Sequence, residues 1–387
     1  MEEKLLDRLR SKIKEVLPEI RALRRSLHSE PEIGLMEYKT REKIARTLKP
    51  ASLSVWEPLL GTDFIGELKG GTERVIVLRA DIDALPIEEK TGLPYQSRNP
   101  GVMHACGHDG HTAILAGAAL TLSALREHLP ATVRFVFQPG EERICAGRDL
   151  VEKGACVGAE AAYALHAWPS LPLGAISCRE GTIFACGSQF HVLLHGKGCH
   201  GAAPEKGFNP IPVGAEIVRR LFRLHQEENP IDKSVVSTCH FDAGTSPTII
   251  PDTALIEGTA RYLSAEKADL MQKKIEEIIE EAVKGTGVTP EVTYDRRYSI
   301  PVVNSRKGFE AVRRSALRAL AADDFRPAQN PSMGMEDFSF YLDGRDGAMF
   351  WLGMGEHTSP IHSTLFDFND HALENGILML ASLALDS

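Results

Sequence analysis

The spacing of apolar and polar residues predicts an α/β protein. Three short apolar runs, Val75–Arg79, Thr132–Phe137 and Ala161–Leu165, are typical of strands that are buried on both faces. A long stretch rich in Ala and Leu, Thr112–Leu129, lies between the first two runs, and Leu5–His28 has helical periodicity. Strands that alternate with helices predict a mostly parallel or mixed sheet flanked by helices.

The middle of the chain follows a different pattern. Strand-like and helix-like segments occur there in the order β-α-β-β-α-β, which is the order of a ferredoxin-like α+β domain. These segments are Ser188–His195, Pro212–His225, Ser234–His240, Ala254–Arg261, Ala265–Val283 and Pro290–Tyr294. Further helix and strand patterns follow at Lys307–Ala321, Ala348–Leu352 and Asn369–Ala384. We therefore expect one domain made of residues 1–185 and 299–387, with residues 186–298 inserted as a second domain.

Composition and charge exclude several classes of protein. The 387 residues are 43% hydrophobic and 25% charged, which is ordinary for a globular enzyme with two or three domains. The formal net charge of −9 argues against a nucleic-acid binder and against attraction to an anionic membrane. No apolar run approaches the roughly 18 residues that span a bilayer, and the charged N-terminal stretch has no signal-peptide core, so we expect a cytoplasmic protein. The seven cysteines lack paired spacing, which argues against a disulfide framework.

Polar residues follow each of the three predicted buried strands. Asp81 and Asp83 follow the first, Glu141 and Glu142 the second, and His166 the third. Open α/β sheets place their sites at the carboxyl ends of strands. The sequence therefore predicts that these three segments meet in one crevice.

The densest polar cluster is the run MHACGHDGH, Met103–His111. Cys106, His108, Asp109 and His111 offer thiolate, imidazole and carboxylate groups within six residues, and the glycines allow tight turns. The run precedes a predicted helix, whose N-terminus favours a thiolate. We interpret it as a metal site; the alternative is a His-rich surface turn with a small buried cysteine.

The other candidates are weaker when each is taken alone. In the pair Glu141–Glu142, one carboxylate could bind a metal while the other acts as a general base, although such a pair is often only a solvated loop. Asp83 could orient ligands or simply bond the loop backbone. His166 and His362 could each be a ligand or a structural histidine.

Several familiar catalytic motifs are absent. The chain contains neither HExxH nor GxSxG, and the segment GKGCHGAAP, Gly196–Pro204, does not fit a phosphate-binding loop. The phosphate-loop interpretation of Gly196–Pro204 is therefore not satisfied, and the missing GxSxG weakens the interpretation as a serine hydrolase.

Taken together, the motifs resemble the M20 metallopeptidase family, in particular its aminoacylase/amidohydrolase branch. The resemblance covers nearly the whole chain, and the combination of MHACGHDGH with the downstream GEE is highly specific. The matching segments are Leu23–Thr40, Arg79–Tyr95, Met103–Ala113, Phe137–Glu142, Leu165–Gly174, Gly196–Pro204, Gly258–Tyr262, Met333–Leu342 and Ile361–Phe366.

The resemblance implies a catalytic domain that binds two divalent metal ions per subunit, zinc or manganese with cobalt or nickel possible. It also implies a smaller ferredoxin-like lid domain through which the protein forms a homodimer. Matched residue by residue, the implied metal ligands are Cys106, His108, Glu142, His166 and His362.

Four further roles follow from the same resemblance. Glu141 would be the general base that takes a proton from the attacking water and returns it to the leaving amine, and Asp83 would support it. His200 would reach across the dimer to stabilise the oxyanion, and Arg261 would hold the substrate carboxylate. The chain also departs from the family pattern at several positions, which the resemblance places in or near the lid, the dimer contact or the substrate pocket. These positions are Cys199, Glu205, Asn209, Thr248 and Ser363–Thr364.

The expected activity is metal-dependent hydrolysis of the amide bond of N-acyl amino acids. The expected partner is a small N-acyl amino acid or dipeptide, with no nucleic acid and no membrane. Three alternatives stay open: a dipeptidase or carboxypeptidase with the same site, a catalytically silent dimeric binding protein, and a cysteine hydrolase with Cys106 as nucleophile. A chelator would inhibit the metal enzymes, whereas thiol alkylation would inhibit the cysteine hydrolase.

Overall fold

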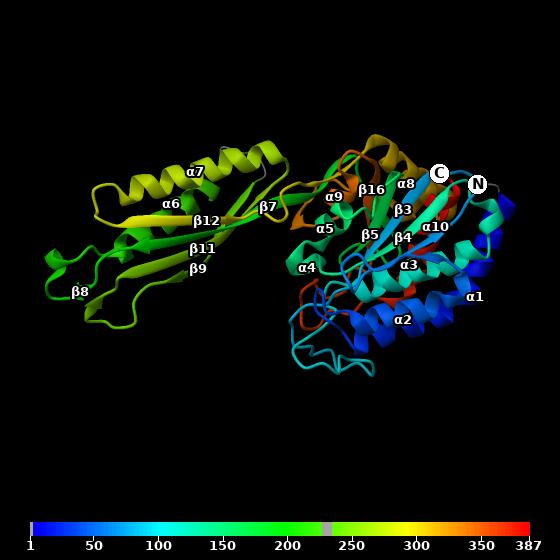
Figure 1. Ribbon diagram of the computed structural model, residues 1–387, viewed down its shortest axis with the longest axis horizontal. Helices are drawn as coiled ribbons and strands as arrows, with labels where there is room; N and C mark the ends of the chain where they lie inside the picture. The colour runs from blue at the N-terminus through cyan, green and yellow to red at the C-terminus, as the bar shows by residue number, and fades with distance from the viewer. Residues whose placement is uncertain (1–2, 227–233) are drawn as a thin grey trace. The chain divides into compact units, whose positions relative to one another are not determined.

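The computed structural model describes residues 3–226 and 234–387, and the chain divides into two units (Figure 1). The first unit contains Met1–Ile183, Val302–Asn330 and Asp337–Ser387, and the second contains Phe184–Pro301 and Pro331–Glu336. Each unit has its own cluster of buried apolar residues. The chain therefore leaves the first unit to build most of the second, returns at Val302, and adds the short stretch Pro331–Glu336 to the second unit before it ends in the first.

An eight-stranded mixed sheet forms the centre of the first unit, in the order β1-β2-β4-β3-β5-β16-β6-β14. The strands are β1 (Ser54–Val55), β2 (Phe64–Leu68), β3 (Val75–Asp81), β4 (Thr132–Gln138), β5 (Ala159–Trp168), β6 (Ile176–Cys178), β14 (Phe325–Pro327) and β16 (Asp346–Gly353). The central strands β4, β3, β5 and β16 are parallel, whereas β2 and β6 pair antiparallel with this group. The expected mostly parallel sheet is confirmed, and its parallel strands end at one common edge.

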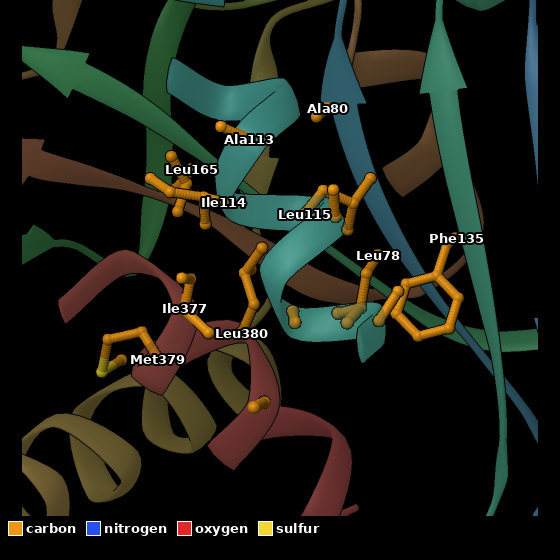
Figure 2. Packing of buried hydrophobic residues seen from close by; sticks show 14 of the residues in the cluster. Leu78, Ala80, Ala113, Ile114, Leu115, Phe135, Leu165, Ile377, Met379 and Leu380 are labelled. Atoms are coloured by element: carbon orange, nitrogen blue, oxygen red, sulfur yellow. The ribbon is translucent and has the colours of Figure 1, made fainter. Parts of the chain in front are cut away.

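Helices cover this sheet and build most of the core of the unit. The helices are α1 (Glu3–Ser29), α2 (Tyr38–Leu48), α3 (His108–Ser123), α4 (Glu141–Ile144), α5 (Ala146–Glu152), α8 (Arg306–Ala319), α9 (Ser339–Leu342) and α10 (Leu373–Leu385). Short 3-10 turns lie at Lys49–Ala51, Arg126–His128, Ala322–Asp324 and Asp370–Ala372. Helix α3 is buried on all sides, as a helix that is apolar all round must be, and it contacts α1, α10 and β3. Figure 2 shows Leu115 of α3 near Leu78 of β3, and Ile377 and Leu380 of α10 packed in the same core.

The second unit has the β-α-β-β-α-β order that the sequence predicts. Its main sheet has the order β12-β7-β11-β9, and neighbouring strands in it are antiparallel. The elements are β7 (Gly181–His195), α6 (Pro210–Gln226), β9 (Val235–Asp242), β11 (Thr253–Tyr262), α7 (Ala265–Val283) and β12 (Thr289–Asp295). Alternate residues of β7 and β11 pack in one cluster with residues of α6 and α7, so the helices cover one face. The short elements β8 (Cys199–His200), a 3-10 turn at Pro204–Lys206, β10 (Ile249–Ile250) and β15 (Ser332–Met335) also belong to this unit, whereas β13 (Val302–Asn304) belongs to the first.

Two predicted boundaries near the candidate site are wrong. The helix expected at Thr112–Leu129 begins at His108 and ends at Ser123, because the left-handed Gly107 (φ 93°) starts the helix earlier. The third strand, expected to end at Leu165, extends to Trp168. Consequently His108, Asp109 and His111 lie in the first turn of α3, and His166 lies within a strand rather than after it.

Cysteine pairing and membrane spans give two further findings for residues 3–226 and 234–387. All seven cysteines lie in this part of the chain and are free. None of its helices is long and apolar enough to cross a bilayer.

A glycine on β16 gives the first testable prediction. A Cβ at Gly347 would lie 2.0 Å from the carbonyl oxygen of Ala162 on the neighbouring strand, and its φ is 143°. Gly344 also has a positive φ, of 68°, but a Cβ there would meet nothing within 4 Å. We expect Gly347→Ala to lower the free energy of unfolding by about 3 kcal/mol or more, and Gly344→Ala by about 1 kcal/mol. Denaturant unfolding measures both variants, and equal losses would show that the backbone collision is unimportant.

Candidate metal centre

The carboxyl edge of the parallel strands carries a compact group of thiol, imidazole and carboxylate side chains. Cys106 Sγ lies 3.4 Å from His166 Nε2, near the end of β5. Glu142 Oε1, on α4 directly after β4, lies 3.2 Å from His362 Nε2 and 3.8 Å from His108 Nε2. The donor atoms form two triads, Cys106–His108–His166 and Cys106–Glu142–His362, whose members lie within 4.8 Å of one another. The structure therefore brings together all five sequence-predicted ligands, in two triads that share Cys106.

Two left-handed backbone positions make this convergence possible. Gly107, between Cys106 and His108, has a φ of 93°, and a Cβ there would lie 3.0 Å from the side chain of Ala167. His362 has a φ of 62°, which is rare for a residue other than glycine. Its backbone N–H donates to the carbonyl of Ala105 at 2.7 Å, which holds it beside Cys106. Strained residues of this kind persist where the surrounding structure fixes them, as at functional sites.

The hydrogen bonds of the histidines aim their second nitrogens at the cluster. His166 Nδ1 lies 2.7 Å from the carbonyl oxygen of Ala167 and donates to it, so Nε2 is the atom that faces Cys106. His108 Nδ1 donates to the carbonyl of Asp83 at 3.0 Å. Its Nε2 is buried and has no hydrogen-bond partner among the residues that the structure describes. Such an orphaned nitrogen beside a carboxylate and a thiol is costly in a protein interior unless a cation is bound.

The electrostatics of the cluster also fit a metal ion. Burial and the adjacent Glu142 carboxylate raise the pKa of the Cys106 thiol. Burial lowers the pKa of His166 to about 3, which leaves its imidazole neutral as a ligand must be. Burial opposes the charge on His108, yet the neighbouring Asp81 raises the pKa of its imidazole to about 10. The carboxylates thus keep a positive charge on a buried imidazole, and the same concentration of negative groups suits divalent cations.

The two adjacent glutamates at the start of α4 take different positions. Glu142 contacts His108 and His362 as described, whereas Glu141 is 6% exposed and its carboxylate lies within 4.8 Å of donor atoms of His108 and Glu142. Asp83 connects the ligand segments, because its Oδ2 accepts the backbone N–H of Glu142 at 3.1 Å and its Oδ1 lies 3.3 Å from His108 Nδ1. Glu141 therefore lies next to the triads, whereas Asp83 contacts residues that carry the ligands and belongs to neither triad.

The other two candidates, His200 and Arg261, belong to the second unit. His200 lies exposed on β8, and its Nδ1 accepts the backbone N–H of Ala202 at 3.0 Å. Arg261 lies on β11, where its guanidinium donates to the carbonyl of Ala260 at 3.2 Å and to the hydroxyl of Thr259. These hydrogen bonds join each residue to neighbours in the second unit, so the expected roles of His200 and Arg261 toward the metal cluster stay predictions.

Asp81 and His111 support the cluster in a way that sequence reasoning missed. Asp81 Oδ1 lies 2.7 Å from His111 Nδ1, and His111 Nε2 accepts the backbone N–H of Ala167 at 2.7 Å. His111 follows His108 by three helical positions, which places both rings on one side of α3. This spacing was the available signal. The two contacts show that His111 connects β3 to the segment of His166.

A second network that was missed holds Asp81 from behind. The guanidinium of Arg79 contacts Asp81 Oδ2 and Asp337 Oδ1, each at 2.8 Å, and Gln138 Oε1 at 2.9 Å. Asp337 Oδ2 also accepts the N–H of Gly147 at 2.8 Å. The signal was the arginine inside an otherwise apolar strand, because a buried charge needs a partner.

Asp109 corrects the interpretation that all four polar residues of the MHACGHDGH run offer ligands together. Its carboxylate lies 3.0 Å from Arg24 Nε and 2.7 Å from His28 Nδ1, on α1. It is therefore occupied by the N-terminal helix and joins neither triad.

Comparison with known proteins adds independent information. The model of peptidase family M20/M25/M40 matches residues 77–386. The chain is 35% identical over 366 residues to the N-acetylcysteine deacetylase of Bacillus subtilis, covering 94% of this chain and 95% of that protein. It is 31% identical over 390 residues to thermostable carboxypeptidase 1 of Saccharolobus solfataricus, covering 98% of both. The crystal structure of the Bacillus subtilis YXEP protein, a dinuclear metal binding peptidase from the M20 family, is similar with a TM-score of 0.82 at 34% identity, covering 96% of this chain and 98% of that one.

Proposed function

Because the chain belongs to peptidase family M20/M25/M40 and is a metal-dependent amidohydrolase of that family, we propose that it hydrolyses the amide bond of N-acyl amino acids. The observation that carries the proposal is the pair of ligand triads that share Cys106, with the Glu141 carboxylate beside them. A relative named as a deacetylase of an N-acyl amino acid supports the substrate class. A relative named as a carboxypeptidase supports the alternative, cleavage of a peptide bond at the same site.

We propose that two divalent metal ions occupy the triads, held by Cys106, His108, Glu142, His166 and His362. A thiol, three imidazoles and a carboxylate suit zinc, and manganese, cobalt or nickel can use the same donors. When bound, such ions supply Lewis acidity, which makes water more acidic and an amide carbonyl more electrophilic. The orphaned His108 Nε2 and the acidic surroundings are the features of this chain that fit them.

Glu141 is the proposed general base. Its carboxylate accepts a proton from the attacking water and transfers it to the nitrogen of the leaving amine, so that the amide breaks into an acid and a free amino acid. Asp83 holds the geometry, because it fixes the His108 ring and the backbone of Glu142 at once. We assign Asp83 a supporting role for this reason.

The proposed substrate contacts come from the second unit. His200, exposed on β8, donates a hydrogen bond to the oxyanion that forms when water adds to the carbonyl, and Arg261 holds the substrate carboxylate. An oxyanion donor is typically worth about 3–4 kcal/mol in the transition state. We also propose that the protein is a homodimer through the second unit, in which His200 of the partner subunit completes each site.

The environment of Cys106 argues against a cysteine hydrolase. A nucleophilic cysteine needs a pKa lowered by neighbouring cations and needs access to substrate. Cys106 is only 5% exposed, and burial together with Glu142 raises its pKa. A catalytically silent binding protein is also disfavoured, because the base and all five ligands occur together.

The test is the release of free amino acid from N-acetyl amino acids, N-benzoyl amino acids and dipeptides. We expect kcat/KM for the preferred N-acyl amino acid to exceed that for dipeptides of the same amino acid by about tenfold or more, since pocket fit discriminates on this scale. A preference for dipeptides would establish the peptidase alternative. Failure to turn over any substrate, with two metal ions bound per chain, would favour the binding protein.

A further inference from the structure

A largely buried ionic cluster joins α1 to two of the segments that carry proposed ligands, those of His108 and His362. We call it the α1 cluster and define it as Arg24, His28, Glu89, Asp109 and Asp367. Arg24 and His28 lie one helical turn apart in α1, and both are completely buried. They belong to the segment Leu23–Thr40, which no step of the proposed reaction uses.

The first arm of the α1 cluster ends beside His108. His28 Nδ1 lies 2.7 Å and Arg24 Nε lies 3.0 Å from the same oxygen, Asp109 Oδ2, while His28 Nε2 lies 3.2 Å from Glu89 Oε1. Burial opposes protonation of His28, yet the adjacent Asp109 raises its pKa to about 9, so both ring nitrogens donate to carboxylates. Because Asp109 directly follows His108 in the first turn of α3, these two contacts fix the start of that helix.

The second arm reaches the segment that follows His362. The Arg24 guanidinium donates to Asp367, and its Nη1 lies 3.4 Å from Asp370 Oδ1. The hydroxyl of Tyr95 donates to Asp367 Oδ2 at 2.8 Å. His362 has a left-handed backbone, which is costly for a residue other than glycine, and these contacts fix the chain five residues after it, at Asp367.

We propose that Arg24 and His28 are positioning residues that set the ligand atoms of His108 and His362 for the metal ions. The inference rests on the proposed function, because that function assigns both histidines as ligands. Partners behind a metal ligand typically change affinity or activity by 10–100-fold when they are removed. A purely structural ion pair would instead change the stability of the metal-free fold and leave metal affinity alone.

Two substitutions of His28 separate these roles. In His28→Asn the amide nitrogen stands near the position of Nδ1 and still reaches Asp109, whereas in His28→Gln it stands near Nε2 and reaches Glu89. The full chain is titrated with zinc against a competing chelator, and thermal unfolding of the metal-free protein is recorded in parallel. We expect zinc affinity to fall by about 10–100-fold in His28→Gln and to stay within about threefold of wild type in His28→Asn. The absorption spectrum of the cobalt-loaded protein should likewise change only in His28→Gln.

Neighbouring arginines supply a matched control and a second variant. Arg25 also pairs with Asp370, at 2.8 Å, but it is 47% exposed and does not contact Asp109. Arg24→Lys keeps the charge but cannot reach Asp109, Asp367 and Asp370 at once, so zinc affinity should fall, whereas Arg25→Lys should leave it unchanged. This pair tests the inference if His28→Gln does not fold.

Three outcomes would overturn these assignments. Equal affinity losses in both His28 variants would show that the Asp109 contact is not what matters. Wild-type affinity in both, with lower stability of the metal-free protein, would leave only a structural role. A wild-type chain that binds no divalent metal would overturn the proposed function itself.

Discussion

Glu141→Gln is expected to lower kcat by about 10²–10⁴-fold, which is the usual contribution of a positioned general base. The amide has the shape of the carboxylate but cannot accept the proton of the attacking water. Glu141 is buried at the start of α4 and belongs to neither Cys106 triad, so metal content should be retained. The measurement is kcat on the preferred substrate, together with the metal content of the same preparation.

Glu142→Gln is the matched control for this prediction. It makes the same chemical change one residue along the chain, but Glu142 contacts His362 and His108. We expect it to lose metal as well as turnover, because a neutral amide is a weaker ligand than a carboxylate. Near-wild-type kcat in Glu141→Gln, or a loss explained by missing metal, would remove Glu141 from the role of base.

Dialysis of the protein against a chelator is expected to reduce turnover by about a thousandfold or more, since Lewis-acid activation contributes several kcal/mol to such reactions. Addition of zinc or manganese should restore it. The measurement is amino acid release before chelation, after chelation and after metal is added back. Turnover that survives complete removal of the metal would contradict the proposed chemistry.

Thiol alkylation of the metal-loaded protein supplies the contrasting control. Cys239 is exposed and Cys199 is partly exposed, so both can react, whereas Cys106 is 5% exposed. The double variant Cys199→Ser/Cys239→Ser therefore removes the accessible thiols without touching the metal cluster. Alkylation of this variant should leave turnover unchanged, and rapid inactivation combined with resistance to chelators would identify a cysteine hydrolase.

The sheet and the ligand segments were predictable because their signals are local. The continuous apolar run Val75–Arg79 by itself predicts a strand that is buried on both faces. Parallel strands bring the residues that follow them to one edge of the sheet. The start of α3 was not predictable in the same way. It depends on the left-handed Gly107, and a glycine alone does not reveal its φ.

The opposite roles of His108 and Asp109 follow from that helix start. Successive residues of an α-helix point about 100° apart, so neighbours in one turn face different surroundings. His108 faces the triads, and Asp109 faces α1. Which direction belongs to which residue depends on how α3 packs between the sheet and α1, and no local pattern contains that information. The partner of Arg79 was hidden for a related reason, because Asp337 lies 258 residues further along the chain.

The position of β16 in the sheet affects how the protein folds during its synthesis on the ribosome. In the finished sheet β16 lies between β5 and β6, yet β5 ends at Trp168 and β16 begins at Asp346. Synthesis at roughly 5–20 residues per second leaves about 10–40 s between the two strands. During that interval one edge of β5 has no neighbour, while the intervening Phe184–Pro301 emerges as a contiguous segment able to condense first. The nascent chain therefore exposes an unpaired apolar strand edge, a template for aggregation, until about the last 42 residues have begun to appear.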